Sequence, residues 1–542
     1  GPRRAAAQDG VVQGVVTGAA TMEPLPGVNV RWASNRGTAT DLNGAYRVQL
    51  PSGSHHITFS SVGYVIVEQD VTVAAGEQRQ LDLALIASTN QLDMVVISAG
   101  KFEQRVGEVT QSLTVIPTEL VRNKNIVSLD DALAQCPGVV VIDNDPQIRA
   151  GSGFSYGAGS RVMMLVDDLP ILSGDIGRPS WSFLPIENLE QVEVIKGASS
   201  VLYGSAALTG VINVRTAYPR AEPRTRVSTF GGVYDTPGHA PAKWWGENPP
   251  LFTGANFFHS RQIGRYDLVL GGNAFSDAGY VGPEVLSPDS LAIDPNRIGP
   301  GGYENSIRAN AGLRYRCKKV RLDFGVNGNA MKSRSTSVFI WDDTDRGLYR
   351  PEPGTVTRTI GSQWYLDPYI NYYSAQGTHH SLKTRYYYQY FNNDNDQSNG
   401  SHMVFSEYRI QQKARFFGET MITAGWSYQG TTSSALLYSG NPDGTGDNTA
   451  TNAAAFIQLD KKILEKIALS LGMRYEKFTV NDDEQSVPVF RAGATYQVLK
   501  STYLRASYGQ GFRFPTIGER YISTNVGNLV IYPNSGLEPE RS

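Results

Sequence analysis

The residues best suited to bind a metal ion lie in one acidic segment, residues 393–400. Its sequence, Asn-Asp-Asn-Asp-Gln-Ser-Asn-Gly, places side-chain oxygens at alternating positions, and Ca²⁺ binds oxygen ligands. The segment lacks the spaced bidentate glutamate that completes an EF-hand loop. A solvated loop is therefore the favoured interpretation, and Ca²⁺ at Asp394 and Asp396 is the alternative. No other cofactor is expected.

The other metal-binding and nucleophilic residues form no recognisable centre. The chain contains 7 His, 8 Met and 2 Cys. Cys136 and Cys317 lie far apart, without the spacing of a zinc site or a disulfide framework. His379 and His380 lie beside a predicted turn, so neither haem nor copper ligation is indicated. No nucleophile is paired with a base, and the sequence therefore predicts no catalytic residues and no enzyme.

The composition favours β-structure with many turns. Of the 542 residues, 56 are Gly and 28 are Tyr, and charged residues make up 18%, compared with about 25% in average soluble proteins. The 49 basic and 51 acidic residues leave a net charge of −2, which disfavours nucleic-acid binding. No run of about 18 apolar residues occurs, which excludes membrane helices but leaves a membrane β-barrel open.

Residues 10–88 have the pattern of a small β-sandwich that follows a tag or leader remnant at residues 1–9. The motif Gly37-Thr38-x-Thr40-Asp41-x-Asn43-Gly44-x-Tyr46 resembles the carboxypeptidase-regulatory-like domain. In that family Asn-Gly forms a turn, so Asp41 is interpreted as a turn residue. Short alternating or β-branched runs predict the strands, at Val11–Val16, Val28–Trp32, Tyr46–Leu50, His56–Ser60, Val65–Val67 and Gln80–Leu85.

Residues 109–217 combine several motifs in one order. Ser128 is positioned to cap a short helix whose first turn carries two acidic residues. The other motifs are Ser112–Pro117, Ile148-Arg149-Ala150-Gly151, Val162–Pro170, Ile186–Gly197, Ser199–Gly204 and Gly210–Val214. Taken together, they closely resemble the plug domain of TonB-dependent outer-membrane receptors.

This resemblance implies the fold class and the energy source. The fold is expected to be mainly β: the N-terminal β-sandwich, a small α/β plug, and an antiparallel 22-stranded transmembrane β-barrel that is incomplete in this chain. In the family, TonB of the inner membrane pairs with a TonB box in the linker before the plug, here residues 89–108. The matching box segment is Asp93, Met94, Val95, Val96 and Ile97. An ordinary edge strand is the alternative for this segment.

Two basic plug residues match positions that pair with barrel carboxylates in relatives, Arg149 and Lys196. Solvated surface charges are the alternative. The family usually has Arg-Gly where this chain has Arg149-Ala150, which puts the local backbone turn in question.

From residue 225 to 542 apolar and polar residues alternate in long runs, as in Ile467–Glu476. Runs of about ten to fourteen residues suit tilted membrane strands, with the aliphatic row facing lipid. Short connections, as at Gln376-Gly377, alternate with longer ones near 235–251, 277–304, 334–359, 392–402, 431–450, 480–486 and 512–541. The longer ones are predicted to be external. The pattern gives about thirteen strands, so the barrel is expected to be incomplete in this chain.

The resemblance implies TonB-dependent import of a scarce solute, such as a siderophore, saccharide or peptide, across the bacterial outer membrane. The N-terminal domain would lie in the periplasm. A surface interaction or signalling receptor without transport is the alternative. The expected partners are TonB, outer-membrane lipid, a small-molecule or oligomeric ligand and, as a further candidate, a surface lipoprotein. Candidate ligand contacts at the plug apex and first loop are Phe154, Tyr156, Asp175, Arg178, Trp181, Trp244 and Trp245.

Overall fold

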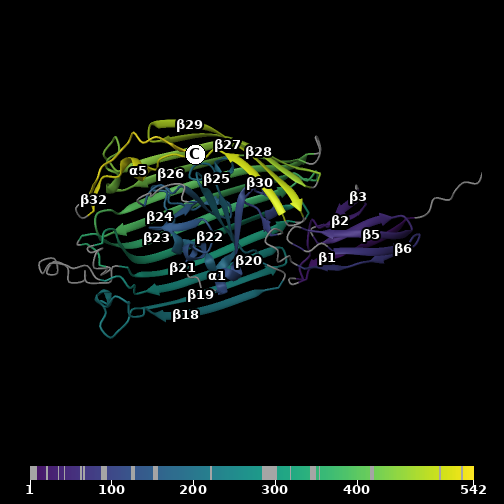
Figure 1. Ribbon diagram of the computed structural model, residues 1–542, viewed down its shortest axis with the longest axis horizontal. Coiled ribbons are helices and arrows are strands. Elements are labelled where there is room, and N and C mark those ends of the chain that lie inside the picture. Colours follow the sequence, from purple (N-terminus) through teal and green to yellow (C-terminus); the bar gives the residue numbers. More distant parts are fainter. Residues whose placement is uncertain are drawn as a thin grey trace, which may run out of the picture.

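The computed structural model shows a small β-domain beside a large curved sheet that surrounds a second small domain (Figure 1). It describes residues 9–542 except 20–21, 34–35, 42, 62–63, 65–66, 87–93, 124–127, 150–156, 220–221, 283–301, 318, 342–349, 353, 415–419, 465, 500–501 and 527–528.

The N-terminal domain is a β-sandwich, as predicted. One sheet has the order β4-β1-β7, with β8 also on β1, and the other has the order β3-β2-β5-β6. Asp41 Oδ1 accepts the backbone N–H groups of Asn43 and Ala45, so this residue forms a turn. The strands are β1 Gly10–Gly18, β2 Asn29–Ala33, β3 Arg36–Ala39, β4 Ala45–Leu50, β5 Gly53–Ser60, β6 Val67–Val73, β7 Gln78–Gln80 and β8 Leu83–Leu85.

Of the strand predicted at Val65–Val67, only Val67 is described, and it begins β6. Residues 65–66 lie outside the described residues, and β6 runs onward from Val67 to Val73. Val71 and Val73 alternate with polar residues and are buried in the sandwich core, so the period-two pattern of these later residues sets the strand.

The plug holds a five-stranded sheet of order β11-β16-β17-β14-β15. Helix α2 begins after Ser128, although the Ser128 hydroxyl donates to Asp130 instead of capping the backbone. None of the helices in the described residues has the length and apolarity needed to cross a membrane. The elements here are β9 Val95–Val96, β10 Gln104–Arg105, η2 Val106–Glu108, β11 Ser112–Pro117, α1 Thr118–Asn123, α2 Leu129–Leu133, β12 Val139–Ile142, β13 Asp145–Ile148, β14 Val162–Val166, β15 Leu169–Pro170, η3 Trp181–Phe183, η4 Ile186–Asn188, β16 Leu189–Lys196, α3 Ser200–Tyr203 and β17 Gly210–Thr216.

Thirteen antiparallel strands, β18 to β30 in chain order, form the curved sheet in the described part, here called the wall. They are β18 Arg224–Val233, β19 Leu251–Ile263, β20 Tyr266–Asp277, β21 Glu304–Cys317, β22 Leu322–Val338, β23 Val356–Tyr373, β24 His379–Asn393, β25 Asn399–Ala414, β26 Thr420–Ser434, β27 Asp447–Ile463, β28 Ile467–Val480, β29 Asp483–Leu499 and β30 Thr502–Gly509. Short elements accompany the wall: η5 Ala240–Ala242, η7 Leu436–Tyr438, β31 Phe512–Arg513, α5 Ile517–Tyr521, β32 Thr524–Val526, β33 Leu529–Ile531 and β34 Glu540–Arg541.

The wall has the predicted two faces. Leu471, Met473 and Tyr475 of β28 are exposed outward, whereas Arg474 and Glu476 of the same strand are buried on the inner face. This alternation confirms the predicted fold class, a mainly β protein with a plug inside a large antiparallel barrel sheet.

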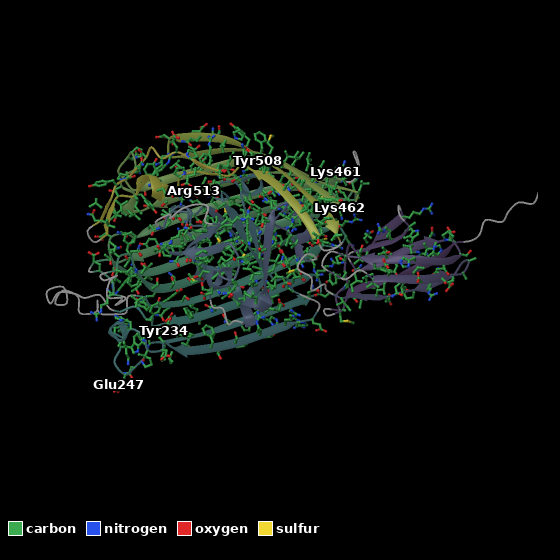
Figure 2. All side chains as sticks on the ribbon, in the orientation of Figure 1. Tyr234, Glu247, Lys461, Lys462, Tyr508 and Arg513 are labelled. Carbon is green, nitrogen blue, oxygen red and sulfur yellow. The ribbon has the colours of Figure 1, made fainter. Side chains whose placement is uncertain are left out.

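Long and short connections alternate at the two ends of the wall. Tyr234 and Glu247 mark the end with long connections, and Lys461 and Lys462 mark the opposite end, beside the N-terminal domain (Figure 2). Two connections predicted to be longer are short: residues 394–398 form a five-residue connection, and residues 481–482 form a two-residue turn. Strands β24, β25 and β29 extend into the predicted loops, where polar residues continue the strand pairing.

Candidate functional site

The plug contacts the wall through a buried carboxylate at a tight turn. Val166 pairs with Leu169, so Asp167 and Asp168 alone connect β14 to β15, with positive φ of 53° and 74°. Such φ values favour Gly or Asn, but Asp also tolerates them. The turn aims the Asp168 side chain into the interface, where it is buried.

Three cations surround Asp168. Arg215 Nη2 of β17 lies 2.9 Å from its carboxylate, Lys383 Nζ of β24 lies 3.0 Å away, and Arg409 Nη1 of β25 lies 4.0 Å away. Burial alone would raise the pKa of Asp168, but these cations outweigh burial and hold the pKa well below its usual value. The carboxylate therefore stays ionised and ties the plug to two wall strands.

The described part of the box segment, Met94 to Ile97, is docked on the plug; Asp93 lies outside the described residues. Strand β9 pairs with β10, and Val96 is fully buried. Gln191 Nε2 donates to the Val95 carbonyl at 3.0 Å. The backbone N–H of Ile97 donates to the carboxylate of Glu193 at 3.1 Å. Side chains of β16 thus hold much of the backbone of this segment.

Ser98, directly after the box segment, joins it to the Asp168 cluster. Its backbone N–H donates to Glu193 Oε2 at 2.7 Å, and Asn213 Nδ2 donates to its hydroxyl at 2.9 Å. Asn213 Nδ2 also donates to Asp168 Oδ1 at 2.9 Å. Arg215 Nε lies 3.6 Å from Glu193 Oε1. One polar network therefore runs from the box segment through the plug sheet to the wall.

A buried lysine after the box segment makes a second connection. Lys101 Nζ pairs with Glu407 of β25, and Gln411 Nε2 donates to the Lys101 carbonyl at 2.9 Å. Burial lowers the pKa of Lys101 to about 8, although Glu407 acts in the opposite direction.

Arg385 of β24 binds the plug backbone. Its side chain is fully buried, and Nη1 donates to the carbonyls of Leu169 and Pro170 at 3.0 and 2.9 Å. Nε and Nη2 donate to Asp367 at 2.8 and 2.5 Å, and the guanidinium lies 4.1 Å from the Tyr365 ring centroid. The ion pair compensates the buried charge while the remaining N–H groups hold β15.

At the external end, Asp175 joins the plug to two wall strands and a loop. Its fully buried carboxylate accepts hydrogen bonds from Gln389 at 2.8 Å, Asn399 at 2.6 Å and the Tyr438 hydroxyl at 3.0 Å. Its carbonyl accepts the Gly518 N–H at 3.0 Å. Asp175 was predicted to contact ligand, and the structure places it as a buried acceptor for wall and loop groups.

A cavity of about 110 Å³ separates the plug from β25–β28 in the external half of the lumen. Its lining includes Ser173, Gln429, Asn452 and Arg474, together with Arg513, which lies at the external end (Figure 2). Arg513 pairs with Glu519 at 2.6 Å and Glu540 at 2.7 Å, and Arg161 of the plug also pairs with Glu540 at 2.7 Å. The rest of the lining is mostly apolar and includes Met163, Phe405 and Phe514, so the cavity combines an apolar surface with a few polar groups that can form hydrogen bonds.

The other predicted ligand contacts that the structure describes lie in two places, the plug and the first long connection. Phe154 and Tyr156 lie outside the described residues. Trp181 is buried, and its Nε1 donates to the Asn144 carbonyl at 2.9 Å. Arg178 is half-buried in the plug. Trp244 and Trp245 make an edge-to-face pair, with centroids 5.8 Å apart, and Trp244 Nε1 donates to the Tyr280 carbonyl of the next connection.

The two basic residues predicted to form plug–barrel ion pairs form none with a described barrel carboxylate. Arg149 is exposed at φ 58°, and no described carboxylate forms an ion pair with it. Lys196 Nζ donates to the Pro137 carbonyl of the plug itself at 2.6 Å.

In the acidic segment, Asp394 Oδ1 accepts the Arg358 N–H at 2.9 Å, and Asp394 Oδ2 lies 3.6 Å from the Arg358 guanidinium. The described residues contain no group of three or more His, Cys, Asp or Glu arranged to hold a metal ion.

Sequence reasoning missed the residues that join plug and wall: Asp168, Glu193, Arg215, Lys383, Arg385, Glu407 and Arg409. The wall members among them occupy the inner, polar positions of alternating strands. The alternation of inward and outward positions along each strand was the available signal. It places many polar residues on the inner face but does not identify the ones that contact the plug.

Comparisons with known proteins match three regions of the chain. Residues 105–211 match the TonB-dependent Receptor Plug Domain, and residues 245–542 match the family described as TonB dependent receptor-like, beta-barrel. Residues 12–97 match the CarboxypepD_reg-like domain.

Similar curated proteins include two vitamin B12 transporters named BtuB. The one from Vibrio cholerae serotype O1 is 22% identical over 457 residues, which is 83% of this chain and 67% of the relative. The one from Vibrio vulnificus is 38% identical over 141 residues, which is 26% of this chain and 23% of the relative. The chain thus spans only part of the length of these relatives.

Similar solved structures include two siderophore receptors named PirA. The one from Acinetobacter baumannii has a TM-score of 0.60 at 15% identity, covering 81% of this chain and 68% of that chain. The one from Pseudomonas aeruginosa has a TM-score of 0.58 at 15% identity, covering 81% and 70%. At these identities the likeness shows the fold alone.

Proposed function

Since the chain belongs to the TonB-dependent receptor family, we propose that it imports a scarce solute across the bacterial outer membrane with energy supplied by TonB. It acts as a transporter and not as an enzyme. The candidate solutes are vitamin B12 and siderophores, for which its relatives are named, together with saccharides and peptides. Members of this family are outer-membrane β-barrels whose plug and N-terminal region face the periplasm. Membership of the family confirms the predicted outer-membrane localisation.

The observation that carries the proposal is the arrangement of the box segment. Strand β9 is only two residues long, and its backbone is held by β10 and by side chains of β16. A partner strand can replace the hydrogen bonds along one edge of β9, because extended peptides bind through main-chain hydrogen bonds. Glu108 of η2, in the linker that contains the box segment, forms an ion pair of 2.9 Å with Lys462. Lys462 lies at the end of the wall beside the N-terminal domain (Figure 2).

A proline substitution tests this function in the full-length protein. Val96→Pro removes a backbone donor and prevents strand pairing at that residue. Ile86→Pro, in the exposed linker just after β8, is the matched control. Cells carrying each variant are assayed for surface binding and for uptake of radiolabelled vitamin B12, ferric siderophores and maltooligosaccharides. The small molecule that co-purifies with the wild type is added to this panel.

The expected result is that Val96→Pro keeps binding and loses uptake, while Ile86→Pro keeps both. Unchanged uptake by Val96→Pro would reject TonB-driven import. Binding without uptake by the wild type would instead support a surface receptor, whose N-terminal sandwich docks a periplasmic partner.

A further inference from the structure

The outward face of the wall carries a group of cations, here called the outer basic cluster: Lys332 and Arg334 of β22 and Arg358 of β23. Met331 of β22 is buried against the plug, whereas Lys332 and Arg334 are exposed on the opposite face. In the strand register Arg334 pairs with Ile360 and Thr336 pairs with Arg358. The three cations therefore occupy neighbouring outward positions on adjacent strands.

Aromatic residues on the same strands indicate the height of this cluster relative to the membrane. Trp364 and Tyr372 of β23 are exposed on the outer face, with Leu366 and Ile370 between them. At about 3.4 Å per residue, the two rings lie roughly 27 Å apart along the strand, which is about 20 Å of height because barrel strands are tilted by about 40°. Two aromatic rows flanking an apolar band of about 25 Å mark the membrane interfaces of outer-membrane barrels. Trp364 therefore lies near the external interface.

The outer basic cluster lies just beyond this external interface. Lys332 pairs with Ser362, the next outward position beyond Trp364 toward the external end, and Arg334 pairs with Ile360 one step further. Ser362 also pairs with Tyr390 of β24, which is exposed. The cations are thus at the level where headgroups of the outer leaflet meet the apolar band.

Lys332 and Arg334 form no ion pair with a carboxylate of the described part of the chain. Arg358 differs from these two, because Asp394 lies 3.6 Å from its guanidinium. Lys477 of β28, exposed near the same end of the wall, differs because Glu484 lies 2.7 Å from its ammonium group.

We propose that the outer basic cluster is a binding site for the phosphate groups of an outer-leaflet glycolipid. Arg guanidinium groups bind phosphate oxygens in pairs, and Lys adds a point charge. Basic residues at a membrane surface attract anionic lipid headgroups. The apolar band below the cluster, with Leu366 and Ile370 exposed, accepts the acyl chains of the same lipid. The site is independent of the transported solute.

The test uses full-length protein in mild detergent, with bisphosphorylated lipid A as the probe. Lys332→Gln/Arg334→Gln is compared with Lys477→Gln, and bound lipid is measured by native mass spectrometry and by titration. Folding of each variant is checked by resistance of the barrel to detergent unfolding. The double variant is expected to bind lipid A about thirtyfold more weakly, because it removes two membrane-surface cations. Lys477→Gln is expected to bind like the wild type.

Two further probes identify the source of the phosphate. Dephosphorylated lipid A should bind the wild type as weakly as lipid A binds the double variant, and inorganic phosphate alone should bind far more weakly than lipid A. The proposal is overturned if folded double variant retains wild-type affinity, if Lys477→Gln loses as much affinity, or if dephosphorylated lipid or free phosphate binds as well as lipid A.

Discussion

The backbone N–H of Ser98 donates to Glu193 Oε2 at 2.7 Å, although 95 residues separate the two in sequence. Glu193 is fully buried, and Arg215 lies 3.6 Å from its other oxygen. A carboxylate that accepts backbone N–H groups away from water forms strong, charge-assisted hydrogen bonds. Glu193 therefore holds the end of the box segment against the plug sheet.

Replacing Glu193 by Gln is expected to loosen the box segment. Hydrogen bonds to a charged group contribute about 1.5–3 kcal/mol each, so amide exchange at Ile97 and Ser98 should become at least about tenfold faster. Capture of a periplasmic TonB fragment should increase in parallel. Glu190→Gln, on the same strand but exposed, is the control. Unchanged exchange at both amides would show that Glu193 does not hold the segment.

The Asp168 cluster is expected to make plug stability depend on pH. Burial opposes ionisation of Asp168, but the surrounding cations depress its folded-state pKa. A depressed carboxyl pKa stabilises the fold above the unfolded value of about 3.9, and this contribution is lost as pH falls through the folded pKa. Asp168→Asn should therefore cost about 3–5 kcal/mol at neutral pH.

The measurement for Asp168→Asn is the unfolding free energy of the full-length protein in detergent at several pH values. The difference between wild type and variant should shrink as pH falls below about 4. A difference that stays constant with pH would mean that the variant acts through packing and not through charge.

Asp175→Asn is expected to loosen the external loop that contains Tyr438. The substitution keeps the side-chain volume but removes the charge that accepts the Gln389, Asn399 and Tyr438 hydrogen bonds. Proteolysis within residues 435–446 should become faster, while the box-segment amides stay protected. Asp235→Asn, in the exposed first connection, is the control. Equal protease resistance of Asp175→Asn and wild type would contradict this assignment.

Arg385→Lys is expected to lower the thermal stability of the plug–wall assembly despite keeping the charge. Lysine cannot reproduce the bidentate bond to Asp367 together with donation to the Leu169 and Pro170 carbonyls. The loss should reach about 2–4 kcal/mol. The exposed Arg334→Lys serves as the control for the same chemical change. Equal melting temperatures of the two variants would show that the fork geometry of Arg385 is unimportant.

Local patterns in the sequence were sufficient for the architecture. The alternation in β28 predicted that Leu471 would face outward, because a strand places successive side chains on opposite faces. The Asp41 turn followed from the preference of Asp and Asn-Gly for turns. The short strand at Val95–Val96 was expected from the apolar β-forming residues of the box segment. Each of these features depends on residues close together in the chain.

Only the tertiary structure decided which charges hold the plug. Lys383, Arg409 and Arg215 come from three strands far apart in sequence, and their meeting at Asp168 depends on how the plug is seated against the wall. Lys196 and Asp175 illustrate the same limit, since one binds the plug's own backbone and the other binds wall and loop groups. The position of a residue in the alternation along its strand determines whether its side chain faces the lumen. Strand register and the placement of the plug determine which residues it contacts there.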